Sequence, residues 1–263
     1  MADRKPRNPG KTPPKTEREI DRALEDTFPA SDPPSWGGSG AERERRRGRA
    51  TAAPVKVARS SGRRALDATG GLQGKTFAIL ATNGFEQSEL MEPKRALLAA
   101  GATIEIVSLL KGRIRGWRMK EWGDEIEVDL DLNAANAERY DGLVLPGGTM
   151  NADTLRGEPR AVHFVKSFFD ANKPVAAICH APWLLIEAEV VDGHTLTSWP
   201  SLKTDVRNAG GEWVDETVVT DGQLVTSRKP DDIPAFNEAM IDLFARNLRR
   251  NTAKIEIAPA DVS

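Results

Sequence analysis

The chain has 263 residues, of which 39% are hydrophobic, and a formal net charge of −2 at pH 7. Its single cysteine cannot form an internal disulfide, and the amino-terminal residues lack the apolar core of a signal peptide. No apolar run reaches the length of a membrane span. We therefore expect a soluble, cytoplasmic protein with no membrane segment, and the nearly balanced charge indicates no special partner.

Residues 1–74 differ in composition from the rest of the chain. They are rich in Arg, Lys, Pro, Gly, Ser and Ala and have almost no spaced apolar residues, which is typical of disorder. We predict a disordered arm over residues 1–74, one domain over residues 75–250 and a tail over residues 251–263. The basic part of the arm could attract nucleic acid, but it has no interleaved aromatic residues, so we favour a flexible charged linker.

From Lys75 onward, apolar runs alternate with helix-like patterns. Strands are predicted over residues 75–80, 103–109, 141–148, 174–178, 195–201 and 215–227, with a strand-like excursion over residues 111–132. Helices are predicted over residues 88–101, 161–171, 201–210 and 230–250, and one opens near Pro182. Strands separated by helices predict an α/β domain with a mostly parallel sheet covered on both faces, whose chemistry lies at the carboxyl ends of the strands.

Cys179 lies between a buried strand and a helix in the segment KPVAAICHAPWLL. A strand that runs straight into a helix forces a sharp turn, and the residue at that turn projects over the edge of the sheet. The helix dipole would lower the pKa of the thiol and favour the thiolate. The alternative is an inert buried cysteine, because free cysteine packs as a small hydrophobic residue.

Gly147 and Gly148 directly follow the predicted strand LVLP. Two glycines permit a turn with positive φ, so that amide N–H groups can face a reacting carbonyl oxygen as an oxyanion hole. Most such pairs are plain turns. Here, however, one helix and one strand separate the pair from Cys179, which places both at adjacent strand ends.

Glu86 follows the first strand in the segment ATNGFEQSEL. A carboxyl group at that edge would experience desolvation and a neighbouring thiolate, which both raise its pKa and let it donate a hydrogen bond to sulfur. The alternative is an acid at a helix N-terminus, stabilised by the helix dipole, and Glu89 fits that description well.

Together, TNGFEQSEL, LVLPGG, PVAAICHAPWLL, residues 196–232 and the closing helix resemble the ThiJ/PfpI family, in particular its PfpI-like protease and deglycase branch. The resemblance covers residues 75 to about 248. It implies a flavodoxin-like, doubly wound fold of the class I glutamine amidotransferase type. It also implies that Cys179 is the nucleophile, that Glu86 hydrogen-bonds it and that His180 completes the reactive set, without a metal or an organic cofactor.

The family resemblance also implies a carboxylate that orients the histidine across a subunit contact, and hence a homo-oligomer with its active site near that contact. The best-placed residue here is Asp153, which is offset by one inserted residue. Trp183, just past the elbow, is a candidate for lining the pocket. His163 and His194 are expected to be structural, because neither shares a strand end with Cys179.

The implied chemistry is attack on a small carbonyl substrate or a glycated protein: glyoxalase activity on methylglyoxal, or deglycation of Cys, Lys and Arg adducts. A thiolate would attack the carbon, amides near Gly148 and His180 would hold the oxyanion, and a nearby group would shuttle the proton. Two alternatives are an intracellular cysteine protease and a non-enzymatic redox-sensing stress protein or chaperone. An extended groove around Cys179 would favour the protease, and a small enclosed pocket the carbonyl enzyme.

Overall fold

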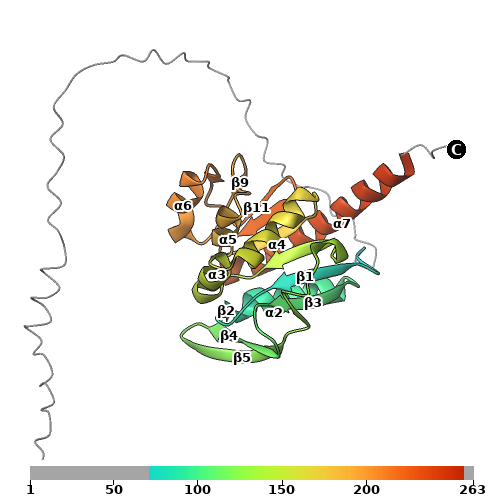
Figure 1. Cartoon of the computed structure of the whole chain (residues 1–263). Coiled ribbons are helices and arrows are strands. Elements are labelled where there is room, and N and C mark those ends of the chain that lie inside the picture. Colours follow the sequence, from blue (N-terminus) through green and yellow to red (C-terminus); the bar gives the residue numbers. More distant parts are fainter. Residues whose placement is uncertain (1–70, 258–263) are drawn as a thin grey trace, which may run out of the picture. The chain divides into compact units, whose positions relative to one another are not determined.

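The computed structural model describes the backbone of residues 71–257 and the side chains of residues 71–249 (Figure 1). The disorder predicted for residues 1–70 therefore lies outside the described residues. Leu72 is fully buried, and its amide donates a hydrogen bond to the carbonyl of Ala100. The packed domain thus includes Leu72, three residues before the predicted boundary at Lys75, because this apolar side chain joins the core.

A seven-stranded sheet forms the centre of the described region. Its strands follow the order β11, β12, β8, β7, β1, β3 and β6, and neighbouring strands are parallel except β11 and β12. The bounds are β1 (Thr76–Leu80), β3 (Thr103–Ser108), β6 (Leu130–Asp131), β7 (Gly142–Leu145), β8 (Val175–Ile178), β11 (Val218–Asp221) and β12 (Leu224–Ser227). The predicted α/β fold with a mostly parallel, doubly wound sheet is confirmed.

Helices supply two separate hydrophobic cores, one on each face of this sheet. The first core uses α2 (Gln87–Ala99) and α7 (Ile233–Ile257), and the second uses α3 (Thr149–Arg156), α4 (Pro159–Asp170), α5 (Pro182–Glu187) and α6 (Lys203–Asn208). Successive side chains of a strand point to opposite faces. In β1, Phe77 and Ile79 therefore join the first core, while Ala78 and Leu80 join the second.

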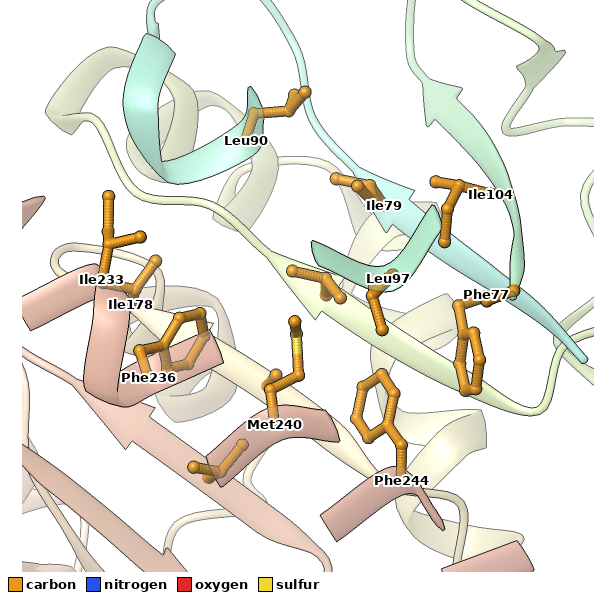
Figure 2. Packing of buried hydrophobic residues seen from close by; sticks show 14 of the residues in the cluster. Phe77, Ile79, Leu90, Leu97, Ile104, Ile178, Ile233, Phe236, Met240 and Phe244 are labelled. Carbon is orange, nitrogen blue, oxygen red and sulfur yellow. The ribbon is translucent and has the colours of Figure 1, made fainter. Parts of the chain in front are cut away.

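The long helix α7 is anchored to the sheet by aromatic packing. The rings of Phe77 and Phe244 stack with their centroids 4.7 Å apart, and Figure 2 shows Met240 and Phe236 continuing this contact along α7. All four side chains are fully buried. The closing helix is therefore part of the core and not an appendage to it.

A second, three-stranded sheet lies beside α2 and carries a hairpin (Figure 1). It consists of β2 (Phe85–Glu86), β4 (Arg113–Arg118) and β5 (Glu121–Glu127). β2 pairs with β4 in parallel, and β4 pairs with β5 in the antiparallel direction. The strand-like excursion predicted over residues 111–132 is this hairpin together with β6.

Three elements differ from the sequence-based expectation. Helix α3 was not predicted, because only Asn151, Ala152 and Leu155 of its eight residues are buried and no apolar period marks it. The strand expected over residues 195–201 is shorter: β9 (Thr195–Leu196) pairs with β10 (Glu212–Trp213), and a 3-10 turn over Pro200–Leu202 follows. Helix α7 runs to Ile257, so part of the predicted tail is helical. The remaining 3-10 turns span Ala137–Arg139 and Pro230–Asp232.

Replacing the aromatic anchor of α7 should destabilise the domain strongly. Phe244→Ala removes a fully buried ring and its stacking on Phe77, which should lower the free energy of unfolding by about 3–5 kcal/mol in urea denaturation. Leu98→Ala, at a position 49% exposed on α2, is the control and should change that free energy by less than about 0.5 kcal/mol. Equal effects of the two changes would contradict the anchoring role.

Candidate active site

Cys179 occupies a strained turn directly after β8. Its backbone is left-handed, with φ of 64°, and the chain enters α5 three residues later. The Cys179 amide donates to the carbonyl of Ser227, and the Cys179 carbonyl accepts from the amide of Trp199. A non-glycine residue at positive φ is uncommon and persists only where its surroundings hold it. Two backbone hydrogen bonds hold this one, so the predicted elbow is present.

Gly147 and Gly148 pack directly against this elbow and against β2. A Cβ atom at Gly147 would lie 2.7 Å from the Cβ of Cys179, and one at Gly148 would collide with the backbone carbonyl of Gly84. Gly148 also has φ of 89°. Both positions therefore require glycine, because the turn after β7, the start of β2 and the elbow after β8 approach one another closely there.

The carboxyl group beside the cysteine belongs to Glu89 and not to Glu86. The Glu89 side chain is fully buried, its Oε2 accepts a 2.9 Å hydrogen bond from the Gly147 amide, and its carboxyl group contacts the Cys179 thiol. Glu86 instead accepts a hydrogen bond from the hydroxyl of Ser88. The expected contact between Glu86 and the thiol was wrong, because one helical turn separates the two acids and only the second faces the sheet.

A signal for Glu89 was present in the sequence. The buried residues of α2 are Glu89, Leu90, Pro93 and Leu97, so this acid stands on the apolar face of the helix. A charged residue on such a face is almost never fully buried without a special environment. The position of Glu89 in the first turn suggested a dipole interaction, and that interpretation hid its burial.

His180 lies directly beside the thiol. Its Nδ1 is 3.2 Å from Sγ of Cys179, and its Nε2 is 3.5 Å from the hydroxyl of Thr149. The ring stacks on Trp199 at a centroid distance of 5.7 Å and meets Trp183 at 5.2 Å. Burial lowers the pKa of His180, so the ring is held neutral and has one unprotonated nitrogen.

Burial dominates the electrostatics of Glu89 and Cys179. It raises the pKa of Glu89 to about 8, with a further contribution from the charge of Glu86. Burial, followed by the charge of Glu89 and its hydrogen bond, raises the pKa of the Cys179 thiol, whereas the amides of Gly148 and His180 lower it. The lowered thiol pKa expected from the helix dipole was wrong, because burial and the buried Glu89 outweigh the favourable amides. A proton on Glu89 removes the charge repulsion, so burial still opposes the thiolate while the two amides favour it.

A cavity of about 700 Å³ opens onto Cys179. Its walls come from α2, from the hairpin residues Trp117, Arg118 and Met119, and from Trp199 and Pro230 on the opposite side. Trp199 therefore lines the cavity, whereas Trp183, the predicted lining residue, contacts His180 from outside it. Its indole N–H donates a hydrogen bond to Asp205 on α6, a residue that does not line the cavity.

The hairpin wall is fastened to the start of α2 by one side chain. The side-chain carbonyl of Gln87 accepts a hydrogen bond from the backbone N–H of Asp124, and the side-chain NH₂ of Gln87 donates to the Asp124 carboxylate, both at 2.7 Å. The pairing of Glu86 with Trp117 adds a backbone connection between β2 and β4. These contacts hold the hairpin at a defined position beside the thiol.

Asp153 lies on α3, where it pairs with Arg156 of the same helix. The Arg156 guanidinium also lies 4.6 Å from the ring centre of Trp183, which in turn contacts His180. Within one chain, no hydrogen bond joins Asp153 to His180 among the residues that the structure describes. His163 lies on α4, and His194 pairs with Asp221, both away from the cavity of Cys179.

Neither metal-binding clusters nor membrane-spanning helices occur in the described part of the chain. Within residues 71–257, no three His, Cys, Asp or Glu side chains gather so as to hold a metal ion. The described helices also include none that is long and apolar enough to cross a membrane.

Fold and site together define an α/β protein with a cysteine on a strand-to-helix elbow at the carboxyl edge of a parallel sheet. Residues 75–243 match the sequence model of the DJ-1/PfpI family, and the chain belongs to this family. General stress protein 18 of Bacillus subtilis (strain 168) is 42% identical over 175 residues, covering 66% of this chain and 99% of the relative.

Two further comparisons extend this similarity. Protein/nucleic acid deglycase 2 of Escherichia coli (strain K12) is 41% identical over 170 residues, covering 64% of this chain and 97% of the relative. The crystal structure of Drosophila melanogaster DJ-1beta superposes with a TM-score of 0.60 at 26% identity, covering 70% of this chain and 99% of that chain. These similarities support a deglycase or stress function for the family members.

Replacing Glu89 by a residue that cannot ionise should change how the free energy of unfolding depends on pH. Folded Glu89 keeps its proton to about pH 8, whereas the unfolded residue loses it near 4.5. The folded state therefore binds more protons in this interval, and the free energy of unfolding should fall as pH rises, by more than about 1 kcal/mol. Glu89→Gln retains an acceptor for Gly147 and should flatten this decline in urea titrations at pH 5 and 8. The control Glu92→Gln, on the same helix, should keep it, and parallel slopes for wild type and Glu89→Gln would contradict the assignment.

The expected role of Asp153 across a subunit contact leads to a mixing experiment. Cys179→Ser and Asp153→Ala should each have weak activity alone. Unfolded together in equal amounts and refolded, they should recover about a quarter of the wild-type sites, because half the chains carry each intact residue and the contact is closed. Confirmed subunit exchange without recovery would exclude the cross-subunit role. A fully active Asp153→Ala would remove this residue from the mechanism.

Proposed function

We propose that this protein is a cysteine-dependent deglycase or glyoxalase that acts on methylglyoxal and on its early adducts. The observation that carries the proposal is the arrangement at Cys179, which lines a cavity with His180 Nδ1 at 3.2 Å and the buried carboxyl group of Glu89 in contact. The 41% identity to a relative named as a deglycase supports the same chemistry.

In the proposed reaction, His180 takes the proton of the Cys179 thiol, and the resulting thiolate attacks the aldehyde-level carbon of the substrate. The protonated carboxyl group of Glu89 stabilises the sulfur without adding a second negative charge. The amides of Gly148 and His180, which hydrogen-bond the sulfur in the structure, stand next to the position where the oxyanion would form. The amine or thiol of an adduct leaves with one proton.

The overall chemistry needs no external oxidant. In a methylglyoxal adduct, the carbon bonded to nitrogen or sulfur is oxidised to a carboxyl group while the neighbouring ketone carbon is reduced to an alcohol. One water molecule is consumed, and lactate and the free amine or thiol are released. After the thiolate has bonded to this carbon and the amine or thiol has left, the proton on the carbon moves to the neighbouring carbon through an enediol, which gives a lactoyl thioester of Cys179. Water then cleaves the carbon–sulfur bond, which releases lactate and restores the thiol.

Cys179→Ser should abolish this activity while the fold remains intact. The exchange is close to isosteric, but a serine hydroxyl is a far poorer nucleophile at neutral pH, so kcat/KM should fall at least about a hundredfold. The substrates are methylglyoxal, glyoxal, methylglyoxal adducts of blocked cysteine, lysine and arginine, and casein. Turnover of an adduct must exceed its spontaneous release of methylglyoxal to count as direct action.

The same panel separates the alternative functions. Cleavage of casein by the wild type but not by Cys179→Ser would identify a protease. Oxidation of Cys179 without turnover of any substrate would identify a redox-sensing protein. Full activity of Cys179→Ser on dicarbonyls would end the nucleophile hypothesis.

A further inference from the structure

The charges around the Cys179 cavity are unevenly compensated. Both lining arginines have acidic partners: Arg95 pairs with Glu92, and Arg118 pairs with Glu121. Among the acids, Glu89 is buried against the thiol and Glu92 is bound by Arg95. Both cations of the cavity are therefore paired, and the lining charges that remain without an ion-pair partner are carboxylates.

Of the cavity acids, Glu86 and Asp124 have no ion-pair partner among the described residues, and Glu86 is the one whose backbone contacts the elbow. Within residues 71–249, its carboxylate forms no ion pair, and it accepts a hydrogen bond from the neutral hydroxyl of Ser88 at 3.1 Å. Its backbone amide donates to the carbonyl of Gly147, the residue whose Cα packs on Cys179. Glu86 is therefore held beside the elbow by main-chain contacts and is a half-buried residue of the cavity wall.

The surroundings of Glu86 suit a flat cation. Trp117, its neighbour across β2 and β4, lines the cavity, as does Trp199, which is stacked on His180 with one of its faces. Indole faces attract guanidinium and ammonium groups, most strongly where water is partly excluded. Burial raises the pKa of Glu86, as expected for a carboxylate whose charge has no counterpart, and a bound cation would reverse that cost.

We propose that Glu86 forms a cation subsite that selects substrates bearing a guanidinium or ammonium group next to the carbonyl-derived carbon. This inference rests on the proposed function and specifies its substrate class. Methylglyoxal adducts of arginine keep a positive charge, whereas free methylglyoxal and cysteine adducts have none. Glu86 is thus a specificity-determining residue, distinct in role from Glu89, which serves the sulfur.

Binding can be measured without turnover in the Cys179→Ser protein. The probes are N-acetylarginine amide and N-acetylcitrulline amide, which differ chiefly in the charge of the terminal group. Calorimetry should show at least about tenfold tighter binding of the arginine compound. Adding Glu86→Gln should reduce this ratio to less than about threefold. Adding Asp170→Asn, at an exposed carboxylate that lines a different cavity, is the control and should preserve it.

Several outcomes would overturn the subsite. Equal affinity of the two probes, no measurable binding of either, retention of the ratio in Glu86→Gln, or its loss in Asp170→Asn would each do so. If Glu86→Gln does not fold, the charge-preserving Glu86→Asp and the loss of the arginine preference at high salt decide instead. These measurements use no turnover, so they test only the cation subsite. Failure of the proposed activity would instead appear in the substrate panel, and the two failures can therefore be told apart.

Discussion

The close approach of three backbone segments at Gly147, Gly148 and Cys179 is the constraint on which the rest of the site depends. Without side chains at the two glycines, β2, the turn after β7 and the elbow after β8 come into direct contact. That contact brings the Gly147 amide to Glu89 and the Gly148 amide to the sulfur. Any side chain there would push the strand ends apart, so the electrostatics of the thiol follow from backbone packing.

The buried proton of Glu89 links the stability of the domain to its chemistry. Oε1 of Glu89 is buried and has no hydrogen-bond partner among the described residues, apart from the thiol that the carboxyl group contacts. A charged carboxylate in that position would be costly, and a protonated one can donate to sulfur. The same proton that keeps the core neutral therefore reduces the negative charge beside the nucleophile. Ionisation above pH 8 would weaken both.

The parts of this protein that could be predicted from the sequence are those governed by local periodicity. Strands such as β1 and β8 are short apolar runs, and their order along the chain led to the parallel sheet and the elbow at Cys179. Glu86 and Glu89 could not be separated in this way, because both stand near the start of α2 and only tertiary packing decides which one faces the sheet. Trp183 does not line the cavity and donates a hydrogen bond to Asp205, a contact between separate segments that no local pattern reveals.

Chemistry and selectivity reside on different parts of the fold. Cys179, His180 and Glu89 are held by the central sheet and its cores, so changes there alter stability as well as reactivity. The cavity wall formed by β2, β4 and β5 belongs to a separate small sheet, which is tied to α2 through Gln87 and Asp124. Substitutions in that hairpin can change the charge and width of the cavity while leaving the elbow in place. The thiol site and the cavity wall therefore rest on separate sheets, so the charge and width of the cavity can be altered without moving the residues that hold the sulfur.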